Sequence, residues 1–111
     1  MKTKFVLFLA ILVYYNSFSQ ATVDIPDNNF KNYLVGNVLI NTNGDTEIQV
    51  TEANDFTGVI NCSQKNIASI SGIESFTSLT ELYLFQNAVF GMDLSQNTAL
   101  EVLDCGNNNI N

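Results

Sequence analysis

The sequence predicts an α/β solenoid of short parallel strands, preceded by a helical N-terminal cap. Two observations carry this prediction. Leucine-centred units recur every 21 to 22 residues over the second half of the chain, and a short amphipathic segment that starts near Pro26 precedes them. A unit of this length cannot bury its apolar side alone, so neighbouring units must stack into one continuous core.

The repeat is clearest in two consecutive units. Five positions recur with a displacement of 21 residues: Leu79, Leu82, Leu84, Asn87 and Val89 match Leu100, Leu103, Cys105, Asn108 and Ile110. An earlier unit follows the same pattern at a displacement of 22, through Ile60, Cys62, Lys65, Ile67 and Ile70. Each unit contains one predicted strand: Leu82 and Leu84 face the core, and Tyr83 between them faces outward. Asn87 follows the strand, where its amide can satisfy backbone groups that the turn leaves unpaired.

This pattern resembles the leucine-rich repeat family, in the variety found in bacterial internalins. The family pattern LxxLxLxxNxIxxI matches Leu79 to Met92 position by position, and residues 70–84 are also similar to that group. The resemblance covers residues 56–111, or about two and a half repeats. It implies the leucine-rich repeat fold but no particular function, because this scaffold binds many unrelated partners. Lys65 replaces the turn asparagine of the first unit, so we expect an irregular first turn.

Residues 20–55 are predicted to form the cap. Pro26 and Asp27 are residues that start helices, and apolar residues follow at helical spacing, interrupted by Gly36. These residues are Phe30, Tyr33, Leu34 and Val38. We expect the first three to cover the open end of the stack, because an uncovered edge strand and apolar end are unfavourable. Residues 50–56 leave room for about one further helical turn before a first strand near Val59. This arrangement resembles both an EF-hand with a short exit helix and the cap of secreted bacterial leucine-rich repeats.

Residues 41–52, NTNGDTEIQVTE, have the ligand spacing of an EF-hand calcium loop. The candidate ligands are Asn41, Asn43, Asp45, Glu47 through its backbone carbonyl, Gln49 and Glu52. Asn41 replaces the usual aspartate, and Thr46 stands where a glycine makes the sharp turn. We therefore expect weak calcium binding, with a Kd of ~10⁻⁴ to 10⁻³ M. The alternative is an ordinary polar turn at Asn43 and Gly44. No other cofactor is expected.

Residues 1–19 are predicted to be a secretory signal peptide. Lys2 and Lys4 precede an apolar run from Phe5 to Tyr15, and residues 17–19 form a small-x-small cleavage site. The apolar run has eleven residues, short of the ~20 that span a bilayer, so no membrane span is expected in the mature chain. The predicted location is secreted or at the cell surface.

Charge and composition argue against several classes of partner and of catalytic chemistry. Cleavage would remove two of the four lysines and none of the eleven carboxylates, leaving a net charge of −9 that repels nucleic acid and anionic lipid. The chain has no histidine and no arginine, so it has no Ser/His or Cys/His couple and no imidazole metal ligand. Paired carboxylates could support glycosidase-like chemistry, but no spacing singles out a pair. We expect the protein not to be an enzyme.

The two cysteines are predicted to be free. Cys62 and Cys105 occupy the same strand position two coils apart. Strands stack ~4.8 Å apart, so the two Cα atoms should be about 9 to 10 Å apart, whereas a disulfide needs less than ~7 Å. We expect both thiols to be buried and unreactive.

The outward strand positions are the predicted binding site. They form three rows across the coils: Val59, Glu81 and Val102; Asn61, Tyr83 and Asp104; Ser63, Phe85 and Gly106. Tyr83 and Phe85 are the candidate anchors, with Glu81, Asn61 and Asp104 as polar contacts. Alternatively, the two rings only cover neighbouring backbone.

Two functions of different classes are open on sequence alone. One is an exported interaction module that binds a protein or glycan through its strand face. The other is a structural or adhesive cell-surface component with calcium as its only specific ligand. The sequence stops at Asn111 within the third unit, which favours a truncated chain over a core completed by a partner.

Overall fold

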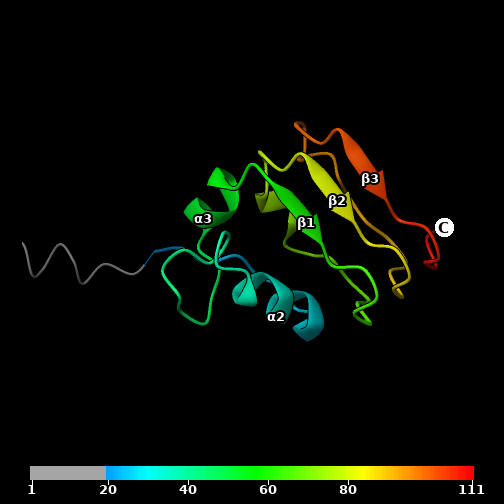
Figure 1. Cartoon of the computed structure of the whole chain (residues 1–111), viewed down its shortest axis with the longest axis horizontal. Helices are drawn as coiled ribbons and strands as arrows, with labels where there is room; N and C mark the ends of the chain where they lie inside the picture. The colour runs from blue at the N-terminus through cyan, green and yellow to red at the C-terminus, as the bar shows by residue number, and fades with distance from the viewer. Residues whose placement is uncertain (1–19) are drawn as a thin grey trace, which may run out of the picture.

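The computed structural model describes residues 20–111, so the predicted signal peptide lies outside the described residues. The elements, in chain order, are α2 (Asn28–Gly36), α3 (Val50–Asp55), β1 (Val59–Asn61), the 3-10 helix η1 (Ile73–Ser75), β2 (Glu81–Tyr83) and β3 (Val102–Asp104). The two helices form the cap, and the strands follow it (Figure 1). Neither described helix is long and apolar enough to cross a membrane.

The strands form one parallel sheet in the order β1, β2, β3 (Figure 1). Val59 pairs with Glu81, which pairs with Val102 on its other side. Two residues later, the row of Asn61, Tyr83 and Asp104 is aligned in the same way. The predicted repeat register is therefore confirmed, while the extended solenoid stays a prediction.

Asn87 holds two coils together, as its position predicted. Its Nδ2 donates to the carbonyl oxygens of Cys62 and Leu84, at 2.9 Å each. Its Oδ1 accepts from the backbone N–H groups of Lys65 and Ile67, at 3.0 Å each. One amide thus pairs four backbone groups that the turns would leave unpaired.

The first turn is irregular, as expected from Lys65. Two of its residues, Gln64 and Asn66, have positive φ values of 58° and 56°. In the second and third turns the positive φ falls once in each, at Gln86 and Asn107. Residues other than glycine rarely adopt this left-handed backbone conformation, which asparagine tolerates better than most.

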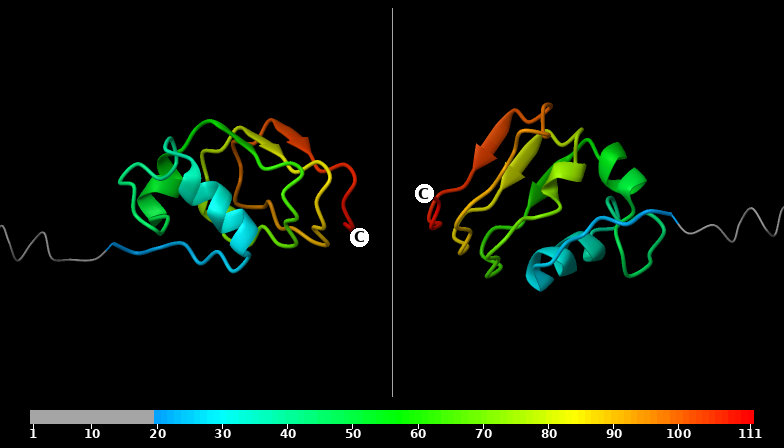
Figure 2. Two further views of the ribbon diagram at one scale, coloured as in Figure 1. Left: turned by 60° about the horizontal axis from the view of Figure 1, so that its bottom comes forward. Right: turned by 180° about the vertical axis from the view of Figure 1, so that it is seen from behind.

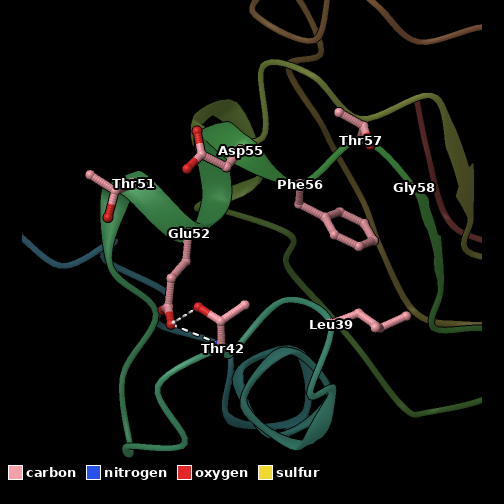
Figure 3. A pocket seen from close by; sticks show the side chains of 8 residues that line it. All are labelled: Leu39, Thr42, Thr51, Glu52, Asp55, Phe56, Thr57 and Gly58. Atoms are coloured by element: carbon pink, nitrogen blue, oxygen red, sulfur yellow. Dashed lines mark hydrogen bonds between the residues drawn. The ribbon is translucent and has the colours of Figure 1, made fainter.

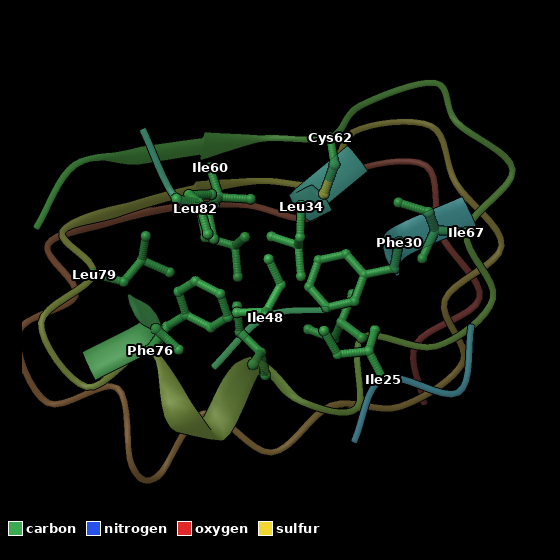
Figure 4. Packing of buried hydrophobic residues seen from close by; sticks show 14 of the residues in the cluster. Ile25, Phe30, Leu34, Ile48, Ile60, Cys62, Ile67, Phe76, Leu79 and Leu82 are labelled. Carbon is green, nitrogen blue, oxygen red and sulfur yellow. The ribbon is translucent and has the colours of Figure 1, made fainter. Parts of the chain in front are cut away.

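Apolar residues of the cap and the coils share one core. Phe30 and Leu34 of α2 lie beside Ile60 of β1 and Leu82 of β2, and all four side chains are fully buried (Figure 4). Figure 2 shows α2 beside the β1 end of the sheet, with β3 at the far edge. The prediction that Phe30, Tyr33 and Leu34 cover the first coil is confirmed for Phe30 and Leu34, and Tyr33 is partly buried against the same core.

The helix α2 ends sooner than the apolar pattern indicated. Val38 was expected on the same face as Phe30 and Leu34, but it lies outside the helix and is 77% exposed. Gly36 is the last helical residue, and the N–H of Asn37 bonds to the carbonyl of Leu34 in a terminal turn. The chain then changes direction, so Ile40 enters the core in place of Val38.

The far edge of the sheet is less covered than the cap end. Leu103 of β3 is 41% exposed, whereas the equivalent Leu82 is fully buried beneath it in the stack. Cys105 is only half-buried for the same reason, so the expectation of two buried thiols holds for Cys62 alone. Both cysteines are free, as predicted.

Candidate functional site

The strand face carries two aromatic side chains from β2 and the residues after it. Leu82 and Leu84 are fully buried, so Tyr83 and Phe85 point to the opposite, outward side. Tyr83 is half-buried, and Phe85 is 37% exposed. The structure therefore places both candidate anchors on the predicted face.

Tyr83 is held in place by a carboxylate. Its Oη donates a hydrogen bond of 2.8 Å to Oε2 of Glu81. That hydrogen bond, then burial, then the charges of Glu81 and Asp104 raise the pKa of Tyr83 above its usual value. Tyr83 is therefore a neutral donor at physiological pH, with Asp104 opposite it on the neighbouring strand.

Phe85 contacts the next coil as well as solvent. A Cβ added to Gly106 would lie 3.4 Å from Cδ2 of Phe85, so the ring rests against the backbone there. The alternative role of covering neighbouring backbone thus applies to part of this ring. The remaining part of the ring is exposed to solvent.

The three polar candidates lie on the same face, around Tyr83. Asn61 and Asp104 are both exposed, and each accepts a hydrogen bond from the backbone N–H two residues later, at 3.3 and 3.1 Å. Glu81 and Asp104 lie on neighbouring strands. The face is therefore aromatic at its centre and negatively charged around it.

Side chains of the candidate calcium loop form hydrogen bonds with one another. Nδ2 of Asn43 donates to Oδ2 of Asp45 at 3.0 Å and to Oε1 of Gln49 at 2.9 Å. Nε2 of Gln49 donates to the same Asp45 oxygen at 2.7 Å. These three candidate ligands therefore converge, with two amide N–H groups turned toward the carboxylate.

The other candidate ligands have separate partners. Both oxygens of Glu52 accept hydrogen bonds within the loop: Oε1 from Thr42 and the N–H of Asn43, and Oε2 from the N–H of Gln49. The Glu47 carboxylate turns away and pairs with Lys31 at 2.8 Å. Across residues 20–111, no three Asp, Glu, His or Cys side chains gather as a metal site.

The backbone of this loop differs from the expected turn. Thr46 does not have a positive φ; that conformation falls on Gly44, with φ of 72°. The turn is therefore reshaped around its threonine. Asn41 is 95% buried, with Nδ2 bound to the carbonyls of Val35 and Asp45, while its Oδ1 has no partner within residues 20–111. An unpaired buried oxygen at the first ligand position fits a cation, whereas the inward amide N–H groups oppose one.

A hollow of about 490 Å³ lies between the cap and the first strand, and the sequence did not predict it. Leu39, Thr42, Glu52, Asp55 and Phe56 are among the residues around it (Figure 3). Leu39 comes from the turn after α2, whereas Glu52 and Asp55 come from α3. These segments meet only in the folded chain, so no spacing along the sequence signals the hollow.

Known proteins match this chain through their structures. No protein-family profile and no curated protein matches its sequence. An internalin, InlF of Listeria monocytogenes, has a TM-score of 0.67 and 25% identity, over 83% of this chain and 27% of that one. The functional domain of L. monocytogenes InlJ, which includes a cysteine ladder, has a TM-score of 0.63 and 27% identity, over 81% of this chain and 21% of that one.

The described residues have an internalin-like repeat fold. The CBM51-2 and INT domains of Clostridium perfringens ZmpB also match, with a TM-score of 0.56 and 22% identity, over 76% of this chain. This chain spans 17% of that structure, 21% of InlJ and 27% of InlF. The similarity therefore concerns one part of each larger protein.

Proposed function

We propose that the protein is an exported, non-enzymatic leucine-rich repeat solenoid that binds a protein or glycan through its strand face at the cell surface. The internalin-like fold supports an interaction module. The basic and apolar segment at the start of the sequence supports export. The acidic surface argues against nucleic acid as the partner.

The observation that carries the proposal is the aromatic pair on the outward face. Tyr83 and Phe85 stand beside the fully buried Leu82 and Leu84 and keep exposed surface. Tyrosine and phenylalanine give a large contact area at a small entropic cost, which suits an interface centre. Glu81, Asn61 and Asp104 would form the polar surround of that centre.

The test replaces both anchors and screens for ligands. Wild-type protein and the Tyr83→Ser/Phe85→Ser variant would be applied to glycan arrays and to displayed cell-surface proteins. We expect every wild-type ligand to lose at least about tenfold in affinity, as for the loss of an interface centre. The Phe90→Ser variant is the matched control, because Phe90 is 65% exposed and lies outside the strands.

Two outcomes would contradict the proposal. One is undiminished binding by the double variant, and the other is equal loss in the Phe90→Ser control. If the double variant unfolds while Phe90→Ser does not, the rings serve the fold rather than a partner.

We propose weak calcium binding by residues 41–52 as a second function, which would suit a structural or adhesive component. The unpaired, buried Oδ1 of Asn41 supports it. Asn41, Asn43 and Asp45 would contribute side chains, with Glu47 through its carbonyl, Gln49 through a water and Glu52 through its carboxylate. Glu52 would give up four hydrogen bonds, which keeps the affinity low.

Calorimetric titration decides this second proposal. We expect saturable heat with calcium at millimolar concentration and none with magnesium, because a reshaped loop suits the larger, more flexible ion. Glu52→Gln and Asp45→Asn should each remove the heat, while Thr46→Gly should strengthen binding. Absence of heat and of any rise in Tm at about 20 mM calcium would exclude the site.

A further inference from the structure

The hollow beside the first strand is separate from the strand face, and it shares Thr42 and Glu52 with the candidate calcium loop. It measures about 490 Å³, within the ~300 to 1,000 Å³ of ligand sites in proteins. Figure 3 shows Phe56 and Leu39 on one side of it, and Glu52 and Thr42 on the other. One wall is therefore apolar and the other is charged.

The apolar wall includes a solvent-exposed leucine. Leu39 is 74% exposed, although its neighbour Ile40 is fully buried. Oδ1 of Asn37 accepts a hydrogen bond of 3.0 Å from the Leu39 N–H, so the turn fixes this exposed position. Phe56 is held by Phe76, whose ring lies edge-on at 6.5 Å. Leu39 therefore adds exposed apolar surface at the rim of the hollow.

The charged wall has one free carboxylate. Hydrogen bonds to the loop hold the Glu52 carboxylate beside the hollow. Asp55 is exposed, and within residues 20–111 no hydrogen bond or ion pair engages its carboxylate. The lysines of this part of the chain lie elsewhere: Lys31 pairs with Glu47, and Lys65 lies over the ring of Tyr33. The hollow thus holds uncompensated negative charge beside apolar surface.

We propose that this hollow binds a lysine or arginine side chain from a basic peptide segment of a partner protein. The aliphatic stem of such a side chain packs along apolar surface while its charged end stays at the polar rim. Here the stem lies against Leu39 and Phe56, and the cationic end reaches Asp55. The acidic chain as a whole attracts such a segment and repels an acidic one.

Titration of the ¹⁵N-labelled protein with a capped tri-lysine peptide tests this. We expect saturable NMR shifts confined to residues 39–42 and 51–58. Leu39→Ser should weaken binding about fivefold or more through lost apolar contact. Asp55→Asn should weaken it about two- to fivefold, the size expected for one exposed ion pair. A peptide of three acetyl-lysines, which keeps the stems but not the charges, should not bind.

Two variants act as matched controls. Val38→Ser removes an exposed apolar neighbour that does not line the hollow. Asp24→Asn changes the net charge by the same one unit as Asp55→Asn at an exposed site. Both should bind within about twofold of wild type. Equal weakening by Asp24→Asn, shifts centred on Tyr83, or no saturation at about 10 mM peptide would overturn the proposal and leave the strand-face function untouched.

Discussion

Buried leucines and asparagines at repeated positions have clear roles, because each takes the same place along its coil. Leu82 and Leu84 were predicted to face inward from their spacing alone, and both are fully buried. The repeat pattern does not predict the role of Asn97, which is buried and donates to the carbonyls of Ile73 and Phe76. Polar residues outside the strand motif carry no apolar period, so hydrophobic patterning cannot find them.

Equivalent leucines should differ in their contribution to stability. Leu82→Ala should lower the free energy of unfolding by about 2 to 5 kcal/mol, as for a fully buried leucine. Leu103→Ala should cost less than about 1.5 kcal/mol, because Leu103 is 41% exposed and removal leaves no closed cavity. Urea unfolding followed by circular dichroism measures both. Equal losses would show that Leu103 is covered in solution.

The two thiols should react at different rates. Burial raises the pKa of Cys62 to about 12, and its Sγ donates to the carbonyl of Tyr83, so little thiolate forms at neutral pH. Cys105 is half-buried at the edge strand. Iodoacetamide should therefore label Cys105 in the native protein and label Cys62 only after denaturation, as read by mass spectrometry. A bridge between Cys62 and Cys105 would contradict the stacked coils.

The helix α2 covers the first coil through polar contacts as well as its buried face. Oη of Tyr33 accepts from the edge N–H of Asn61 at 3.1 Å, and Nδ2 of Asn29 donates to the carbonyl of Asn66 at 3.0 Å. Asp27 caps the helix through Phe30 and also accepts from two N–H groups of the first coil. The sequence predicted the helix start at Asp27, but not partners more than 40 residues away.

The contacts of Asp27 should make stability depend on pH. Burial acts to raise its pKa, but backbone N–H donors outweigh this and the pKa lies below its usual value; the donors belong to Phe30, Ala68, Ser69 and Asn29. A lowered folded-state pKa gives stabilisation that is complete above the unfolded pKa of ~3.9 and is lost as pH falls through the folded value. Asp27→Asn should lower the free energy of unfolding by about 1 to 2 kcal/mol at pH 7. The reason is that the amide N–H₂ group, which replaces one carboxylate oxygen, cannot accept a hydrogen bond.

This difference between wild type and Asp27→Asn should shrink as the pH falls below about 4, since protonation removes the same acceptor from the wild type. Thermal unfolding at several pH values measures it. Asp24→Asn is the control, because Asp24 is exposed. A difference that stays constant down to pH 2 would mean that the charge of Asp27 does not stabilise the fold.

The loop of residues 41–52 marks a limit of sequence reasoning. Asparagine and glutamine carry both an oxygen and an N–H₂ group, so the same spacing suits a cation or a set of internal hydrogen bonds. The structure turns the N–H₂ groups of Asn43 and Gln49 toward Asp45. Only the fold around an amide decides which end faces inward.

Residues 20–111 have one apolar core that runs from the cap into the coils. Phe30, Leu34 and Ile48 of residues 20–55 share it with the strand residues. The repeat period predicted the sheet, since every coil reuses one pattern. The hollow could not be predicted, because Leu39 and Phe56 belong to segments that have no shared period and meet only through this core.

Removing the cap should therefore abolish folding. A fragment of residues 56–111 exposes Ile60 and Cys62 at its first edge, and its few coils bury too little surface to offset chain entropy. We expect no cooperative thermal transition for it, whereas residues 20–111 should unfold in one. Phe30→Ser/Leu34→Ser in the full chain should also lose the transition. A fragment that melts cooperatively would show that the coils are independent of the cap.

Three asparagine side chains that bond to the backbone of a neighbouring coil act in one direction along the chain. Asn87 pairs backbone groups of the coil before it, and Asn97 and Asn108 do the same for the coil that contains Asn87. A coil is therefore complete only when its successor exists. Synthesis proceeds from the N-terminus, so each coil can complete these hydrogen bonds only after the next coil has been made. The most recently made coil therefore still lacks them. For residues 20–111 studied alone, opening should begin at β3 and proceed toward the cap.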